Sequence, residues 1–296
     1  MTEAAEPFGF LAVDKPRGWT SHDIVAKVRR GTGVKRVGHA GTLDPMATGM
    51  LILCIGAATR LSEYVMHTDK LYIATVRLGV ETDTYDAEGQ VVATKPINKL
   101  TREALDFTLS QFSGEIEQVP PMFSAIKQNG KKLYELARAG KEVERAPRTV
   151  HIHAIHIYEW EPPDAKIVVW CSSGTYIRSI AHDWGHILGV GGHLTELHRR
   201  IVGSFQVMTP WEELLNSFDD GSWTQYIRSE FQALQHIPAI YLDAAQTDDM
   251  QHGRPISRME DIGSTPLRRA YADDDGLFLG IVEAKDHHWQ PIKVFG

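Results

Sequence analysis

The most informative stretch of this 296-residue chain is residues 38–49, which read GHAGTLDPMATG. One carboxylate, Asp44, stands among turn-forming and apolar residues, and three glycines permit positive φ or close approach to a ligand. Pro45 fixes φ directly after Asp44, so the acid is expected on a stiff loop. The apolar run 50–55 is typical of a buried strand. A carboxylate held rigidly at the mouth of a sheet suits a nucleophile or a base, although an ordinary turn has the same composition.

Length and composition predict a globular chain with a sizeable core. Hydrophobic residues make up 43% of the sequence, which fits one large domain and one small domain. No apolar run approaches the ~20 residues of a transmembrane helix. Residues 1–7 lack the basic and apolar regions of a signal peptide. Cys54 and Cys171 lie in apolar runs and are predicted to be buried thiols, so a cytoplasmic location is expected.

The net charge of -7 is distributed unevenly. Residues 211–296 carry 7 Lys/Arg and 15 Asp/Glu, whereas residues 1–210 carry 24 and 23. Basic side chains concentrate at residues 27–36 and 127–148. Local patches of this kind can neutralise RNA phosphates, although each cluster could equally be solvated surface.

The hydrophobic pattern predicts an α+β domain with a mixed, mostly antiparallel sheet and flanking helices. A helix capped by Thr20 and Asp23 is expected to end at Gly31. Further helices are expected at 58–66, 100–112 and 177–188, and strands at 9–13, 50–55, 72–78, 151–158, 166–172 and 199–203.

Two further regions are expected outside this sheet. Residues 114–148 form a basic excursion, partly helical near 132–139, where a nucleic acid could be gripped. Residues 211–235 are expected to form a helical bridge. From residue 238 onward, short strand signals separated by turns predict a small β-rich domain, with strands at 270–272, 277–282 and 292–295.

Several separate motifs between residues 8 and 215 resemble those of pseudouridine synthases, most closely the bacterial TruB family, which modifies uridine 55 in the TΨC loop of tRNA. The motifs are Lys15-Pro16, the run GTLDPMATG at 41–49, and the run CSSGTYIR at 171–178. The resemblance implies the pseudouridine synthase fold for residues 1–237. It also implies a PUA-like domain for residues 238–296, although that match is diffuse.

The resemblance implies an isomerisation in which the N1–C1′ bond of uridine breaks, the uracil turns, and C5 joins C1′. Asp44 would be the nucleophile, and Arg178 would keep it charged and oriented. Tyr72 would stack on the uracil, and its hydroxyl could assist proton removal. Attack at C1′, addition to the uracil ring and removal of the 2′ proton all remain open for Asp44, with C1′ favoured. No cofactor and no metal are expected.

Other positions are expected to bind the substrate. Tyr176 and Leu197 match family positions that contact the base, and Leu197 would form an apolar wall. His39 would fill the space that the uridine leaves when it flips out of the stack.

The RNA stem and the catalytic loop also need support. Lys131 and Lys132, in the basic excursion, are expected to hold the stem by its phosphates. Lys15 and Pro16 are expected to brace the catalytic loop rather than act chemically.

The expected partner is the T-arm stem-loop of tRNA. Neither membrane binding nor an obligate protein partner is expected, and the enzyme is expected to be a monomer. Two alternatives remain: a module that binds and folds tRNA without catalysis, and a guide-dependent relative that modifies rRNA. The intact set of Asp44, Tyr72 and Arg178 argues against pure binding. Activity on a free T-arm stem-loop without guide RNA would distinguish a tRNA-modifying enzyme from the guide-dependent relative.

Overall fold

The larger of two main sheets runs through a computed structural model that describes residues 6–122, 127–128, 131–132, 143–257 and 265–295. Its strand order is β1-β3-β12-β4-β11-β10-β7, with β2 attached to β3. Neighbours are antiparallel except β3 and β12, so the predicted mixed, mostly antiparallel sheet is confirmed. The strands are β1 (Gly9–Lys15), β2 (Val37–His39), β3 (Thr48–Ile55), β4 (Lys70–Leu78), β7 (Gly114–Gln118), β10 (Arg148–Glu161), β11 (Asp164–Cys171) and β12 (Gly192–Val202).

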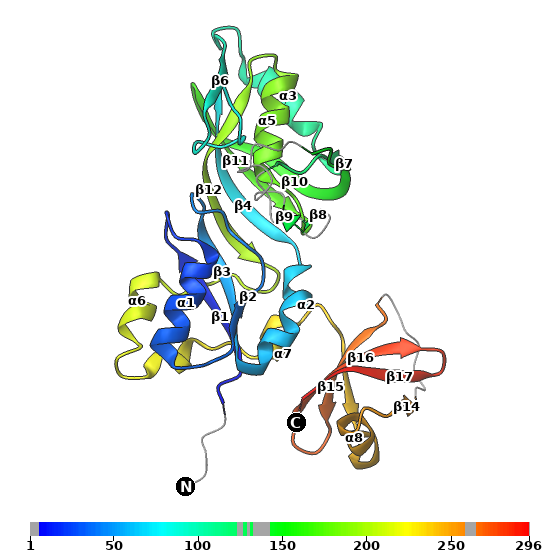
Figure 1. The fold of residues 1–296 in the computed structure, drawn as a ribbon. Helices are drawn as coiled ribbons and strands as arrows, with labels where there is room; N and C mark the ends of the chain where they lie inside the picture. The colour runs from blue at the N-terminus through cyan, green and yellow to red at the C-terminus, as the bar shows by residue number, and fades with distance from the viewer. Residues whose placement is uncertain (1–5, 123–126, 129–130, 133–142, 258–264, 296) are drawn as a thin grey trace.

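Helices flank the sheet at both ends (Figure 1). Helices α3 (Arg102–Ser110) and α5 (Ile177–Ile187) pack near β10, β4 and β12, while α1 (Ser21–Thr32) packs beside β2. The capping box predicted for α1 is present, because the side chains of Thr20 and Asp23 each accept from the other's backbone amide. The helix ends at Thr32, one residue beyond Gly31. Among the described residues, no helix has the length and apolar character to cross a membrane.

Strands β1 and β3 are apolar over most of their length, up to Val13 in β1 and after Thr48 in β3, because both of their faces are covered. Alternate side chains from the two strands enter separate cores. Leu11 and Leu53 pack into the core that contains α1, whereas Phe10 and Ile52 pack into the core on the opposite face. Strand β4 instead alternates, with Ile73 and Arg77 exposed as its sequence predicts, although Thr75 between them is buried. The two cysteines are buried free thiols, also as predicted.

The region expected to be a continuous helix at 211–235 is broken into three short pieces, and the prediction was wrong in that respect. They are α6 (Trp211–Asn216), η2 (Ser222–Tyr226) and α7 (Glu230–Ala233). Gly221 adopts a left-handed conformation between the first two pieces, and the Asp220 side chain accepts from the Ser222 amide. This local turn interrupts the helix. Residues 56–66 likewise divide into η1 (Gly56–Leu61) and α2 (Ser62–Met66).

The basic excursion is described only in part. Two short strands, β8 (Lys127–Gln128) and β9 (Lys131–Lys132), pair antiparallel within it. The helix predicted near 132–139 lies almost wholly outside the described residues.

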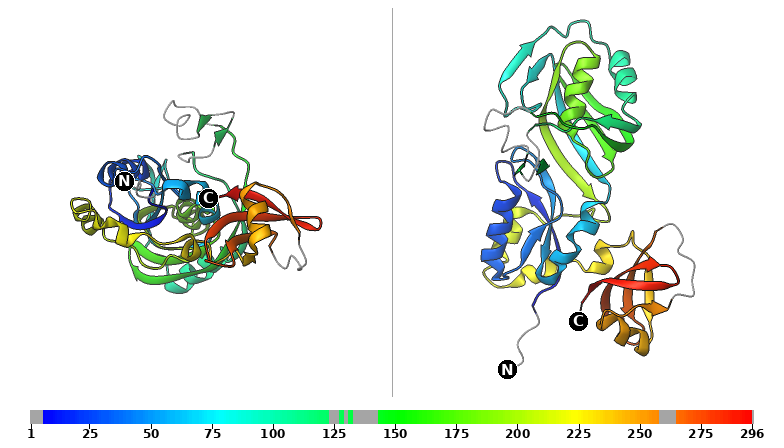
Figure 2. Two further views of the ribbon diagram at one scale, coloured as in Figure 1. Left: turned by 90° about the horizontal axis from the view of Figure 1, so that it is seen from below. Right: turned by 45° about the vertical axis from the view of Figure 1, so that its right-hand side comes forward.

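A second sheet lies near the C-terminus, with the order β13-β15-β16-β17-β14. Figure 1 and the right-hand view of Figure 2 show it beside α2 and α7, away from α3 and α5. Arg60 donates to the Val294 carbonyl at 2.7 Å, and Phe278 packs in the same core as Phe10 and Ile52 of the larger sheet. The elements are β13 (Ala239–Leu242), α8 (Ala244–Gln251), β14 (Ile256–Ser257), β15 (Leu267–Ala272), β16 (Phe278–Lys285) and β17 (His288–Val294).

Replacing Gly49 with alanine should destabilise the fold strongly. Its φ is +92°, and a Cβ there would lie 2.5 Å from the Arg199 carbonyl oxygen, so backbone must move. Gly33 is the matched control, because its φ is +71° but a Cβ would meet no atom within 4 Å. In urea unfolding, Gly33→Ala should cost about 1–2 kcal/mol and Gly49→Ala roughly 3 kcal/mol or more. Equal losses would contradict the close approach of β3 and β12.

Candidate active site

The loop that carries Asp44 is anchored by a buried lysine. The Lys15 ammonium donates to the carbonyls of Trp19 at 2.7 Å, Pro16 at 3.0 Å and Pro45 at 3.3 Å. Burial lowers the pKa of Lys15 to about 8, although the charge of Asp44 acts in the opposite direction. Lys15 has no exposed surface, so its ammonium lies inside the loop that it holds.

A second brace comes from β12, where Arg199 is buried. Its guanidinium donates to the carbonyls of Met50 at 2.7 Å, Gly41 at 3.0 Å and Thr42 at 3.3 Å. The loop is thus fixed from two strands, by hydrogen bonds that each bear a charged donor. These bonds restrict the position of the Asp44 carboxylate.

Arg178, at the start of α5, lies between two carboxylates. Its Nε is 3.1 Å from Asp44 Oδ2, and its Nη1 is 3.2 Å from Asp86 Oδ2. The side chains of Arg178 and Asp86 are each 5% exposed, whereas that of Asp44 is 36% exposed. The buried Asp86 therefore fixes the guanidinium, whereas the partly exposed Asp44 presents an ionisable oxygen.

Asp86 is itself held in place by the turn that precedes it. Its Oδ1 accepts from the Thr84 hydroxyl at 2.6 Å and from the Glu88 amide at 3.1 Å. With both oxygens bonded, Asp86 has little freedom to move away from Arg178.

Opposing effects act on the Asp44 carboxyl. Burial by the surrounding loops raises its pKa, Arg178 lowers it, and the nearby charge of Asp86 raises it. Without the guanidinium, the protonated form of Asp44 would be favoured still more over the ionised form, because desolvation penalises the charged form. Arg178 is therefore the strongest of the charges that favour an ionised Asp44, and the more distant Lys15 and Arg199 act in the same direction.

Tyr72 and Leu197 approach from the central strands. Tyr72 lies on β4 directly opposite Arg199 on β12, and Leu197 lies opposite Ala74. Both Tyr72 and Leu197 are 8% exposed and share one core. Burial raises the pKa of the Tyr72 hydroxyl, so the phenol stays protonated at neutral pH.

Tyr176 immediately precedes α5. Its amide donates to Gln118 Oε1 at 2.7 Å, and its carbonyl accepts from Gln118 Nε2 at 2.9 Å. This paired contact to β7 fixes the backbone two residues before Arg178.

His39 ends β2 and packs edge-on against His22, with ring centroids 5.5 Å apart. Burial lowers the pKa of His39 to about 4, and the charges of His22 and Arg199 act in the same direction. The ring is therefore neutral at neutral pH. Its Nδ1 is buried and has no hydrogen-bond partner among the described residues.

The structure thus brings Asp44 and Arg178 into contact and places Tyr72 and Leu197 in one shared core. It does not test the roles of Lys131 and Lys132, whose side chains lie outside the described residues. Two residues of the site were missed from the sequence, Asp86 and Arg199. A signal existed for Asp86, which lies in a polar turn beside β4, but nothing local indicates its partner 92 residues away.

Asp86→Asn should destabilise the protein, because the buried Arg178 guanidinium would lose one of its two charged partners. Breaking a buried ion pair typically costs about 3–5 kcal/mol, and we expect about 3 kcal/mol in urea unfolding. Asp83→Asn, in the same turn, is the control: Asp83 is exposed, and its side chain accepts from the Gln90 amide, its one hydrogen bond within the described part of the chain, so about 1 kcal/mol or less is expected. Similar losses for both variants would rule out the pairing as a structural anchor.

Comparison with known proteins gives the chain a family. Residues 29–177 match the N-terminal domain of TruB family pseudouridylate synthases, and residues 238–294 match the C-terminal domain of pseudouridine synthase II TruB. The tRNA pseudouridine synthase B of Aromatoleum aromaticum is 46% identical over 281 residues, covering 93% of this chain and 88% of the relative. That of Symbiobacterium thermophilum is 53% identical over 205 residues, covering 68% and 69%.

The solved structures agree on the fold. The archaeal box H/ACA sRNP Nop10–Cbf5 complex contains a chain that is 23% identical, with a TM-score of 0.75 and coverage of 98% of this chain and 86% of that one. The predicted pseudouridine synthase fold and isomerase class are both confirmed. On these matches, the chain belongs to the TruB family of pseudouridylate synthases.

Proposed function

We propose that this enzyme converts uridine 55 in the T-loop of tRNA to pseudouridine, with Asp44 as the nucleophile. The observation that carries the proposal is the contact between Asp44 and Arg178 at 3.1 Å, at the partly open end of an otherwise buried ion-pair network. Relatives named tRNA pseudouridine synthase B support tRNA as the substrate.

The proposed chemistry balances without an added reagent. An Asp44 oxygen attacks C1′ of the flipped uridine, and the N1–C1′ bond breaks to release a uracil anion. The uracil turns, C5 attacks C1′, and the Asp44 carboxylate leaves again. The proton then departs from C5, and N1 gains one. Arg178 serves this sequence by favouring the carboxylate form of Asp44 before attack and after release.

The surrounding side chains would hold the base. Tyr72 would stack on the uracil, while Leu197 and Tyr176 would bound it on other sides. Because the Tyr72 phenol is protonated at neutral pH, proton removal by its anion is disfavoured. His39 is neutral and flat, so it suits the gap left by a flipped base better than a charged side chain would.

The remaining parts of the proposal concern RNA binding and organisation. The basic excursion, through Lys131 and Lys132, would hold the T-arm stem by its phosphates. Residues 1–237 would form the catalytic domain, and residues 238–296 a PUA-like domain. We propose a monomer that acts in the cytoplasm without an obligate protein partner and that also assists tRNA folding.

The direct test is incubation of an unmodified tRNA transcript with the purified enzyme, followed by position-resolved mapping of pseudouridine. We expect conversion at uridine 55 alone, and also in an isolated T-arm stem-loop without guide RNA. Asp44→Asn should leave no detectable product, because the amide cannot act as the nucleophile, but should bind tRNA within about twofold of the wild type.

Asp83→Asn provides a matched control in which an exposed carboxylate of the same domain is lost, and it should retain full activity. Product formation by Asp44→Asn would contradict the nucleophile, and conversion elsewhere in the tRNA would contradict the substrate position. Accelerated folding of a misfolded tRNA by the Asp44→Asn variant would support the chaperone role, and its absence would remove that role.

A further inference from the structure

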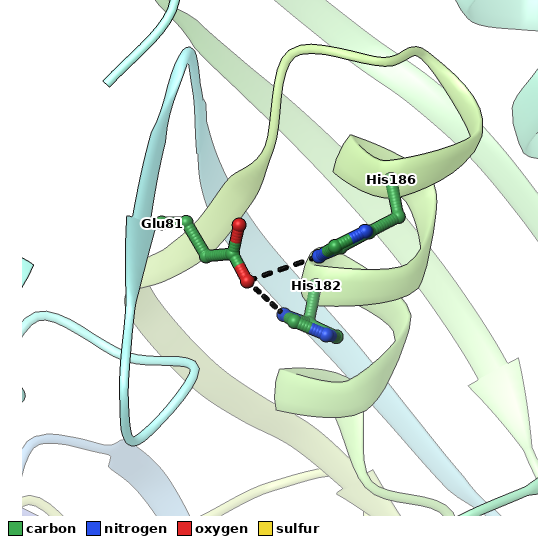
Figure 3. Close-up of side chains that lie close together, drawn as sticks. All are labelled: Glu81, His182 and His186. Carbon is green, nitrogen blue, oxygen red and sulfur yellow. Dashed lines mark hydrogen bonds and ion pairs between the residues drawn. The ribbon is translucent and has the colours of Figure 1, made fainter. Parts of the chain in front are cut away.

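Glu81, His182 and His186 form a cluster outside the Asp44 network. Figure 3 shows both imidazoles projecting from α5 toward Glu81 on β5 (Val80–Thr82), the strand that pairs with β6 (Val91–Thr94). Glu81 Oε1 is 3.0 Å from His186 Nε2 and 3.7 Å from His182 Nδ1. One potential ligand atom from each of the three residues lies within 4.8 Å of the others.

These groups match a transition-metal ion in type and spacing. Histidines four residues apart lie on one face of a helix, and a neighbouring carboxylate completes a His₂Glu set. Tetrahedral zinc with bonds of about 2.0 Å separates its ligand atoms by roughly 3.3 Å. The two distances from Glu81 lie on either side of this value, and no two of the three ligand atoms are more than 4.8 Å apart, so side-chain rotations would bring them to coordination distance.

His182 has an unsatisfied ring nitrogen and a fixed ring orientation, as expected of a metal ligand. Its Nδ1 is buried and makes no hydrogen bond within the described part of the chain. The ring stacks on Tyr85 with centroids 3.8 Å apart and planes inclined by 19°. Its orientation is therefore set before any ion arrives.

We propose that Glu81, His182 and His186 bind a divalent transition-metal ion of the zinc type. Two imidazoles favour zinc over magnesium or calcium, which prefer oxygen ligands. His186 is 54% exposed, so an ion in solution can reach the cluster. The sequence-based expectation of no metal did not take His182 and His186 together with Glu81, which lies 105 residues before His186 along the chain.

Such an ion would link two elements that support the active site. Arg178, His182 and His186 follow one another at four-residue intervals along α5, and Glu81 precedes the turn that ends at Asp86. Tyr85 in that turn holds a positive φ of 66° while it stacks on His182. The bound ion would fasten β5 to α5 and restrict the turn from which Asp86 reaches Arg178.

The test is calorimetric titration of the tag-free, metal-stripped enzyme with zinc chloride, together with cobalt(II) absorption spectra. We expect one tight site per chain, a visible cobalt band typical of tetrahedral coordination, and a higher unfolding temperature with zinc. His186→Ala and Glu81→Gln should each weaken binding on the order of 100-fold, more than changes at outer-sphere residues do. His182→Phe keeps a ring against Tyr85 while removing the ligand, and should behave likewise.

The matched control removes two other neighbouring histidines. The ring centroids of His151 and His153 are 4.8 Å apart, and His153 Nε2 is 3.1 Å from Asp69 Oδ2. The double variant His151→Ala/His153→Ala should retain the site, with unchanged stoichiometry and cobalt spectrum. Zinc binding that disappears in this control but persists in folded His182→Phe and His186→Ala would overturn the proposal. Absence of tight binding by the wild type would also overturn it and leave the cluster as a hydrogen-bonded pair.

Discussion

The active site depends on one guanidinium that is shared between two carboxylates. Arg178 is buried, so it requires a nearby negative charge, and the equally buried Asp86 carboxylate lies 3.2 Å from its Nη1. The second carboxylate, Asp44, can then remain partly open to a substrate while its own charge is still compensated. A lone buried aspartate at this position would gain stability by protonation, and a protonated acid is a poor nucleophile.

The fold holds Asp44, Arg178 and Asp86 at fixed positions relative to one another. Asp44 lies on a loop tied to β1 through Lys15 and to β12 through Arg199, while Arg178 begins a helix packed against β12. These supports come from strands covered by cores on one or both faces, so the loop cannot shift without disturbing packing. Such rigidity suits a reaction in which an oxygen must approach one carbon of a flipped nucleotide.

Local patterns in the sequence predicted the structural features that depend on residues close together in the chain. The capping box of α1, the buried run of β3 and the alternation of β4 each follow from side chains close in sequence. Arg178 was assigned through a family motif, and its contact with Asp44 fits that assignment. Asp86 and Arg199 were missed because their partners come from distant segments. The break at Gly221 was missed because a few turn residues outweighed the surrounding helical pattern.

The measurement that most directly tests this account is the titration of the Asp44 carboxyl, followed by carbon-13 NMR in protein with labelled aspartate. In the wild type, the pKa should lie above the ordinary 3.8, because burial outweighs Arg178. Arg178→Gln removes the charge that lowers this pKa, so the midpoint should move further up and the ionised fraction should fall at every pH near it. An unchanged or lower midpoint in Arg178→Gln would contradict the claim that Arg178 keeps Asp44 ionised.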